Sequence, residues 1–390
     1  MNYTKNESAV YELEQLVEDL RQTLIERLNP RAVILAGSFG RGEVTVEMNG
    51  ESLEFTSDCE VVIVDDRLPL KNTIVSEIEA GFRNKYGLDL DISGVKNTLQ
   101  FHLGYFGPTI NNYDLKYGSE TIYGPDLTDE IPEFTPKEVP IWEGIREMFN
   151  RMIEVCRVYK NDPTKKKLFY WLDKLVFACQ DALLLQFDQY DPSYEVRASL
   201  LEDIELQNEG ISVRIEDLVD LCREALDRKL YGYTGIRNSS KSYWNQVQKV
   251  CNSVFKFTLI QELEIHADDY SNFPKQYLTK DLTDYIRMPG RNRSIQNLWS
   301  LAKFVGVYHE LPTPSLIRKC RSQLAHEIYA VIPLLFFSQE YESLRSGAHL
   351  DVVSERVGEM CEVDFPDQST NDKWRYLVDR VVYLWKRLCW

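Results

Sequence analysis

The sequence predicts an α+β protein, with a mixed β-sheet in the N-terminal third and helices through most of the remainder. Short apolar runs bounded by turn residues lie at residues 32–36 and 60–64, and such runs are typical of buried strands. From residue 141 onward, apolar residues recur every three to four positions, which is the period of an amphipathic helix.

The N-terminal third begins with a helix and continues with strands and a second helix. Apolar residues recur at helical spacing from residue 7 to 28, and Asn29-Pro30 then ends this helix. Alternating apolar residues flank Asn49-Gly50, which is the strongest short-range signal for a β-hairpin. We expect this hairpin at the edge of the sheet. The other elements expected here are strands at 32–36, 60–64 and 88–93 and a helix at 71–85.

The composition of residues 129–140 divides the chain into two predicted domains. This segment is rich in proline, glutamate and aspartate, as linkers are. We therefore expect a sheet-containing domain at 1–128, a linker at 129–140 and a helical domain at 141–390. The helices expected in the second domain are 142–159, 165–186, 215–228, 242–265, 295–307, 313–338 and 371–390.

The charge and the cysteines exclude several classes of protein. The net charge is −16, which disfavours a general affinity for the nucleic acid backbone but leaves room for a local basic groove. None of the eight cysteines forms a Cys-x-x-Cys pair, so no zinc site is indicated. The chain opens with polar residues, and its longest apolar run, 331–337, is too short to cross a bilayer. We expect a cytoplasmic protein without a membrane partner.

The most informative stretch joins a small-residue turn to two carboxylates. Gly37-Ser38 follows the first strand, and Asp58 and Glu60 open the second. Strand side chains alternate between faces, so Asp58 and Glu60 point the same way. Two like charges on one face are costly unless a cation lies between them. A divalent-metal site beside a phosphate site is therefore predicted.

These residues resemble the signature of the polymerase β-type nucleotidyltransferase superfamily. The resemblance covers Ala36-Gly37-Ser38-Phe39-Gly40-Arg41-Gly42-Glu43 and Ser57-Asp58-Cys59-Glu60, followed by apolar residues. It implies that residues 1–128 form a nucleotidyltransferase catalytic domain of mixed-sheet type, with the helical domain covering its cleft. Two departures are the acidic residue Glu60, where aspartate is usual, and a longer segment between turn and carboxylates.

The resemblance also implies the rest of the site. A third carboxylate is expected on the third strand, where Asp91 in Leu90-Asp91-Ile92-Ser93 matches the family context and Asp89 is the reserve. These acids would hold Mg²⁺, or Mn²⁺, and the backbone of Gly37 and Ser38 would hold the triphosphate of an NTP. Lys174 is a further candidate for nucleotide contact. Arg41 either contacts phosphate or pairs with Glu43.

Four other segments keep an alternative interpretation. The sequence 118–126 resembles the part that closes the catalytic domain in related transferases and is more often structural. Lys165-Lys166-Lys167 favours a solvated helix face. The basic sequence 287–293 is either an anion site or a solvated loop. Arg321 and His326 have the Arg-x4-His spacing of helical ribonuclease domains, although a partly buried helix histidine is the favoured interpretation.

The predicted function is metal-dependent transfer of a nucleoside monophosphate from an NTP to a hydroxyl group, with release of pyrophosphate. The acceptor is left open between a small molecule, a protein side chain and an RNA end. The alternative is a catalytically degenerate domain that binds nucleotide without turnover and acts as an antitoxin-like interaction module. Glu60 separates these two functions, because it is the departure from the family pattern that bears directly on catalysis.

Overall fold

The computed structural model confirms the α+β class and divides the chain into two compact units. It describes residues 3–50, 52–67, 71–95, 108–207, 215–236, 238–266, 270–280, 324–341, 343–344, 347–361 and 369–389. The first unit comprises Met1–Pro140, Phe187–Glu209 and Val219–Gly235, and the second comprises Ile141–Gln186, Gly210–Leu218 and Ile236–Trp390. The first unit thus ends its first segment near the predicted linker but also takes in two later segments of the chain.

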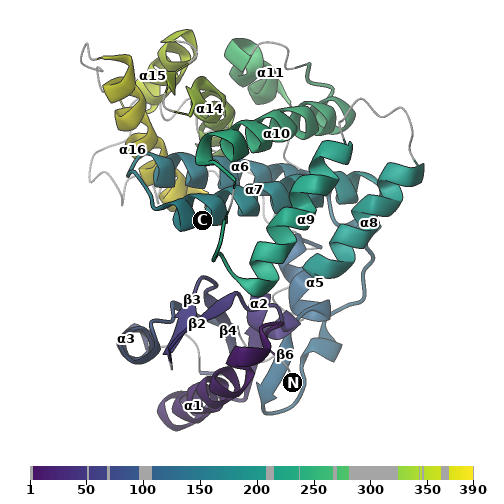
Figure 1. The fold of residues 1–390 in the computed structure, drawn as a ribbon, viewed down its shortest axis with the longest axis vertical. Coiled ribbons are helices and arrows are strands. Elements are labelled where there is room, and N and C mark those ends of the chain that lie inside the picture. The colour runs from purple at the N-terminus through teal and green to yellow at the C-terminus, as the bar shows by residue number, and fades with distance from the viewer. Residues whose placement is uncertain are drawn as a thin grey trace. The chain divides into compact units, whose positions relative to one another are not determined.

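The first unit contains a four-stranded mixed sheet (Figure 1). Its strands are β1 (Ala32–Ala36), β4 (Cys59–Val64), β5 (Leu90–Val95) and β6 (Glu120–Tyr123), in the order β5-β4-β1-β6. Strand β4 pairs with β5 in parallel, whereas β1 pairs antiparallel with β4 and β6. The mixed sheet and three of its strands were predicted. The fourth strand was not, because its four residues are only half-buried and show no long apolar run.

Helices cover one face of this sheet. Helix α1 (Val10–Leu28) and helix α3 (Asn72–Tyr86) contribute to one core with the inward residues of β1, β4 and β5. Each helix ends on a left-handed residue, Asn29 at φ +46° and Gly87 at φ +69°, the conformation that asparagine and glycine tolerate best. A smaller core on the other face includes Leu115 of helix α5 (Ile110–Tyr117) and Leu127.

The predicted hairpin is present, but its expected position at the edge of the sheet was wrong. Strands β2 (Val46–Asn49) and β3 (Ser52–Phe55) pair with each other in a separate two-stranded sheet, with Met48 opposite Leu53. The N-terminal segment accounts for this position. The N–H of Val44 donates to the Tyr3 carbonyl at 3.0 Å, and the Asn6 side chain donates to the Val46 carbonyl at 2.9 Å.

The later segments of the first unit are helical. They are helix α8 (Tyr194–Gln207) and most of helix α9 (Ile215–Tyr231). Glu43, which is buried, binds the start of α8, because its carboxylate accepts from the Ser193 hydroxyl at 2.8 Å and from the Tyr194 N–H at 2.9 Å. The sequence predicted α9 but neither α8 nor α5.

The second unit is built mainly from helices. Helices α6 (Ile141–Tyr159) and α7 (Lys165–Gln186) lie so close that a Cβ at Gly144 would stand 2.5 Å from the Cα of Ala182. The other described elements of this unit are α10 (Ser240–Leu263), α11 (Phe273–Thr279), α14 (Leu324–Ser338), β7 (Gln339–Glu340), β8 (Ser343–Leu344), α15 (Gly347–Cys361) and α16 (Thr370–Leu388). Short 3-10 helices lie at Glu7–Ala9, Thr128–Glu130, Pro136–Glu138 and Tyr270–Asn272.

Some predicted helices lie outside the described residues. The helix expected at 295–307 is one of them, and of the helix expected at 313–338 only the part from Leu324 is described. A search of the described helices for one with the length and apolar character needed to cross a bilayer found none.

Two glycines in helices of the first unit give a matched test of packing at the end of β1. A Cβ at Gly40, in helix α2 (Gly37–Arg41), would stand 2.5 Å from the Leu35 carbonyl oxygen and 2.7 Å from that of Gly118. A Cβ at Gly81, in α3, meets nothing within 4 Å. We expect Gly40→Ala to lower the free energy of unfolding by about 1–3 kcal/mol, because backbone must move. We expect Gly81→Ala to raise it by up to about 1 kcal/mol. Urea unfolding followed by circular dichroism measures both, and equal stability of the two variants would contradict the packing.

Candidate functional site

The Gly37-Ser38 turn lies directly against the carboxylate of Glu60. Gly37 begins α2 at φ +58°, a conformation that glycine adopts at little cost. A Cβ at Gly37 would stand 3.0 Å from both Cδ and Oε2 of Glu60. The backbone conformation therefore favours glycine here, and a Cβ would also crowd the neighbouring carboxylate. The turn and one of the predicted acidic residues are in van der Waals contact.

The pairing of β4 with β5 brings Glu60 and Asp91 side by side. The two residues are register partners in the parallel pair, and such partners present their side chains on the same face of a sheet. Cys59 and Val61 point into the core, so Glu60 points to the opposite face, where it is exposed. Asp58 immediately precedes β4 and is also exposed. The structure thus places all three predicted acids at one end of β4 and β5.

Asp91 and its reserve Asp89 occupy different surroundings. Asp89 precedes β5, and its carboxylate accepts a hydrogen bond from Nε of Arg83 at 2.9 Å with both side chains largely exposed. Asp91 lies within β5 opposite Glu60. The register therefore favours Asp91 as the partner of Glu60, and the Arg83 contact gives Asp89 a surface ion pair instead.

The two faces of β4 have different surroundings, one buried and one exposed, and Cys59 lies on the buried face. The thiol lies between Asp58 and Glu60 in sequence but is fully buried on the core side. Burial raises the pKa of the Cys59 thiol well above its ordinary value, and the negative charges of Asp58 and Glu60 raise it further. A thiol with a raised pKa stays protonated and is a poor metal ligand. The candidate ligands of a cation on this strand are therefore its carboxylates, not its thiol.

A lysine that the sequence analysis did not select reaches the turn. The ammonium of Lys229, near the end of α9, donates to the Ser38 hydroxyl at 2.8 Å and to the Ser57 hydroxyl at 3.0 Å. The Lys229 carbonyl accepts from the Thr45 hydroxyl at 2.7 Å, and the residue is buried. A positive charge is therefore held between the turn and the residue just before Asp58.

The lysine that the sequence analysis did select, Lys174, belongs to the second unit. It lies on α7 with its ammonium 4.7 Å from the ring centre of Tyr170 and 5.0 Å from that of Trp171. Lys229 had a detectable signal in the sequence. It falls four residues after Ala225 and seven after Cys222, both buried, so helical periodicity places a lysine on the buried face of α9.

Arg41 forms an ion pair with Glu43, which was one of the two roles predicted for it. Its side chain is 7% exposed, and its guanidinium lies 3.3 Å from the carboxylate of Glu43 and 3.2 Å from that of Asp114. Burial lowers the pKa of Arg41, but the nearby groups Asp114, Tyr194 and Glu43 together more than offset this and leave the pKa above its ordinary value. Arg41 therefore fastens the end of α2 to α5.

Three cations surround the ring of Tyr194 in the first unit. The guanidinium of Arg197 lies 4.1 Å from the ring centre, that of Arg41 5.3 Å, and the ammonium of Lys229 5.5 Å. Cations over an aromatic face are attracted by its quadrupole. Tyr194, the first residue of α8, therefore lies close to two arginines as well as to Lys229, whose ammonium contacts Ser38.

The remaining predicted segments are placed as follows. Residues 118–126 contain β6, and Gly118 packs on Pro192, so this segment has a structural role. His326 is a buried residue of α14 whose ring centre lies 6.0 Å from that of Tyr277. Arg321 and the basic sequence 287–293 lie outside the described residues.

The acidic residues fit a divalent cation in chemistry and in register. Carboxylate oxygens are the ligands that Mg²⁺ prefers, and Mn²⁺ accepts them too. Glu60 and Asp91 are neighbours across the strand pair, with Asp58 two residues before Glu60. Among the described residues, no three acidic, histidine or cysteine side chains are already gathered into a metal-binding group. The donor set is therefore suitable in its chemistry, although the three acids are not already gathered into such a group.

The chain was compared with protein-family models, with curated proteins and with solved structures, and none of the three comparisons gave a match. The function proposed below therefore rests on the residues of the first unit and their contacts.

The neighbouring positions of Glu60 and Asp91 can be tested with thiol chemistry. We expect the double variant Glu60→Cys/Asp91→Cys to be bridged rapidly by a short bifunctional thiol reagent, because the two residues are exposed register partners. The control is Glu60→Cys/Asp66→Cys, since Asp66 is exposed beyond the far end of β4. Mass spectrometry of the labelled peptides measures the bridge. Equal bridging in both variants would contradict the register.

Proposed function

We propose that the first unit transfers a nucleoside monophosphate from an NTP to a hydroxyl acceptor and releases pyrophosphate. The observation that carries the proposal is the contact of Gly37 with the carboxylate of Glu60. This contact brings the Gly37-Ser38 turn, which we propose holds phosphate, beside the acidic residues at the N-terminal ends of β4 and β5. Nucleotidyl transfer needs these two features within the length of one triphosphate.

The turn and Lys229 would hold the triphosphate. The absence of a side chain at Gly37 lets phosphate oxygens approach the backbone amides closely. The Ser38 hydroxyl and the Lys229 ammonium are already 2.8 Å apart, so a phosphate bound at the turn would meet both a hydroxyl donor and a fixed positive charge. Hydrogen bonds from a charged donor to phosphate are roughly twice as strong as neutral ones.

The acids would act on the acceptor side of the reacting α-phosphorus, away from the leaving pyrophosphate. Asp58, Glu60 and Asp91 are the residues that would hold Mg²⁺, or Mn²⁺ in its place. Such an ion supplies charge neutralisation for the phosphates and lowers the pKa of a hydroxyl bound to it. The carboxylates themselves would keep the acceptor side negative, which favours loss of the proton from the acceptor hydroxyl as its oxygen bonds to the α-phosphorus and pyrophosphate leaves.

The acceptor is defined only by its hydroxyl group. A small molecule, a protein side chain and an RNA end all supply one. The test is incubation of the full chain with each α-labelled NTP, Mg²⁺ or Mn²⁺ and a cell extract, followed by identification of the labelled product. Label in any one of these three classes would support transfer and name the acceptor.

A second candidate function is nucleotide binding without turnover. The specific observation in its favour is that the acidic side chains are not gathered into a metal-binding group among the described residues, together with glutamate at position 60. Tight NTP binding with no pyrophosphate release in the presence of metal and extract would support this interaction module over the transferase.

Substitution of the acids tests catalysis. We expect Asp58→Ala and Glu60→Gln to lower the transfer rate by at least about a hundredfold, because a lost carboxylate weakens charge stabilisation in the transition state. Glu60→Asp should retain part of the rate, with a changed preference between Mg²⁺ and Mn²⁺. The matched control is Asp66→Ala, which removes an exposed acid beyond the end of β4. Parental pyrophosphate release by Asp58→Ala would refute the catalytic assignment.

Substitution of two lysines tests how the triphosphate is held. We expect Lys229→Met to weaken NTP binding about tenfold, the effect of losing one charged hydrogen bond. Lys174→Met is the comparison, because the sequence predicted a nucleotide contact there. Isothermal titration calorimetry gives the dissociation constants, after circular dichroism has shown that Lys229→Met is folded. Undiminished affinity in Lys229→Met with weakened binding in Lys174→Met would restore the sequence-based assignment.

A further inference from the structure

The long segment between the turn after β1 and the acidic residues begins with a stretch that has two different faces. Val44 and Val46 are buried in the core that includes α1. Glu43, Thr45 and Glu47 alternate with them and are buried as well. Buried polar groups are costly unless they form hydrogen bonds. The partners of these three residues therefore show what the polar face of this stretch does.

The two acids of this stretch bind the two helices that the first unit takes from later in the chain. The carboxylate of Glu43 accepts from the N–H of Tyr194, at the start of α8, at 2.9 Å. The carboxylate of Glu47 accepts from the N–H of Tyr233, two residues after α9 ends. A Cβ at Gly232 would stand 2.5 Å from Cγ of Glu47, so glycine at this position leaves room for the acid. The stretch is thus bound to the beginning of one helix and to the end of the other.

Thr45 lies between the two acids and contacts Lys229 in two ways. Its hydroxyl donates to the Lys229 carbonyl at 2.7 Å. Its N–H donates at 3.0 Å to the hydroxyl oxygen of Ser57, which also accepts from the Lys229 ammonium at 3.0 Å. Thr45 therefore holds the backbone of the lysine directly and its ammonium through Ser57. All three residues are buried.

These contacts bear on the entropy of the Lys229 side chain. A lysine side chain has many rotamers, and ordering them is costly. A group that is already ordered before its ligand arrives loses less entropy on binding, which raises the affinity. Thr45 fixes both the backbone from which the lysine extends and one of the two hydroxyl groups that its ammonium contacts.

We propose that Thr45 is a positioning residue, which holds the Lys229 ammonium between Ser38 and Ser57 and thereby sets the affinity for the triphosphate. The effect on nucleotide affinity rests on the proposed function, whereas the effect on the position of Lys229 does not. The long segment between turn and acids then has a role of its own, since it connects the turn to the helix that supplies the lysine.

The position of Lys229 can be measured without a nucleotide, by the rate at which an amine-reactive acylating reagent modifies this lysine in the full chain. We expect Thr45→Val to raise that rate at least about fivefold, because it removes a hydrogen bond that holds the backbone of the lysine. Thr45→Ser retains a hydroxyl group and should restore the slow rate. Mass spectrometry of the modified peptides gives the rates, after circular dichroism has shown that each variant is folded.

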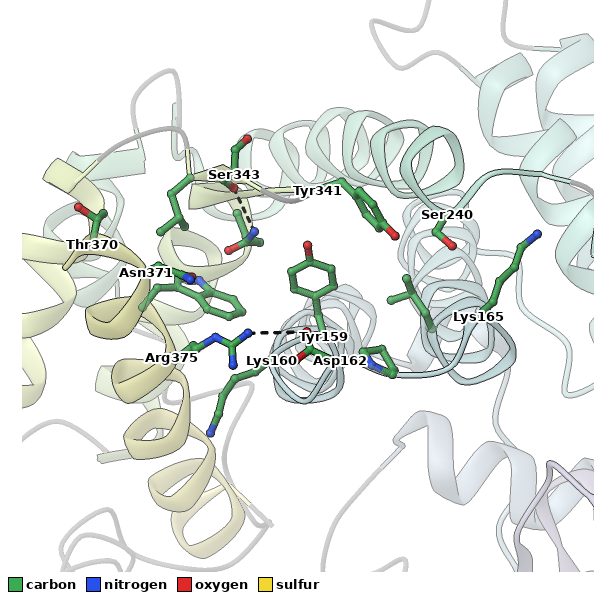
Figure 2. Close-up of a pocket in the computed structure, with 15 residues that line it drawn as sticks. Tyr159, Lys160, Asp162, Lys165, Ser240, Tyr341, Ser343, Thr370, Asn371 and Arg375 are labelled. Atoms are coloured by element: carbon green, nitrogen blue, oxygen red, sulfur yellow. Dashed lines mark hydrogen bonds and ion pairs between the residues drawn. The ribbon is translucent and has the colours of Figure 1, made fainter. Parts of the chain in front are cut away.

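Two controls accompany this measurement. Thr56 belongs to the same segment, and its buried hydroxyl makes no hydrogen bond with any described residue, so Thr56→Val should leave the rate at Lys229 unchanged. Lys165 is the internal reference, because it is exposed and belongs to the second unit. It donates to the Ile236 carbonyl at 2.9 Å, and Figure 2 shows it at the edge of a cavity with its ammonium directed away from the open space. Its rate should be the same in every variant.

Calorimetric titration with ATP, GTP, CTP and UTP separates positioning from a general structural role. For the NTP that the parent binds most tightly, we expect Thr45→Val to weaken binding about fivefold. We expect Thr45→Val/Lys229→Met to bind no more weakly than Lys229→Met alone, because an effect that passes through the lysine disappears without it. A purely structural role would cause the same loss in both backgrounds.

The outcomes distinguish this proposal from the proposed function. A parental labelling rate at Lys229 in folded Thr45→Val, or an equal loss of NTP affinity in both backgrounds, would overturn the role of Thr45. Faster labelling of Lys229 in a chain that binds no NTP would uphold the positioning of the lysine and refute the proposed function. If Thr45→Val does not fold, Thr45→Ala, which introduces no new atoms, takes its place with the same expected rates.

Discussion

The geometry of the candidate site depends on one buried ammonium group. Lys229 binds the hydroxyl groups of Ser38 and Ser57, and its carbonyl accepts from Thr45. It therefore fixes the turn after β1 relative to the start of β4, where the acidic residues lie. Burying a lysine is costly unless its charge is compensated. Under the proposed function, a phosphate bound at the turn would bring a negative charge to an ammonium group that these hydroxyl contacts already hold in position.

The contact between Gly37 and Glu60 gives a physical meaning to the unusual residue at position 60. Glutamate is one methylene longer than aspartate, and this length lets the carboxylate extend from β4 across to the turn. A Cβ at Gly37 would stand 3.0 Å from this carboxylate, so a side chain at position 37 would force Glu60 to shift. The glutamate that departs from the pattern this sequence resembles is thus accommodated by the local packing, and it lies between the Gly37-Ser38 turn and its register partner Asp91.

Local patterns in the sequence were sufficient for three of the four strands of the sheet, but not for the half-buried β6 or for contacts with residues from later in the chain. Strand alternation predicted that Asp58 and Glu60 share a face, and β1 and α7 have the predicted bounds. Lys229 lies 191 residues from Ser38, and no local pattern encodes such a contact. Lys174 was suggested by the resemblance, in which a helix lysine reaches the triphosphate, and the resemblance does not specify which helix supplies that lysine. The hairpin was recognised from Asn49-Gly50, whereas its separation from the main sheet depends on hydrogen bonds with the N-terminal segment.

The discontinuous make-up of the first unit has a consequence during synthesis. Its sheet is encoded before residue 124, but Lys229 belongs to a segment that starts at Val219. At the usual rate of about 5–20 residues per second, the ribosome adds this lysine several seconds or more after the strands have emerged. During that interval the nascent chain has the turn and the acids without the ammonium that joins them. If the first unit binds a nucleotide as proposed, that affinity would be acquired late, and a chain truncated before α9 would carry the turn and the acids without this lysine.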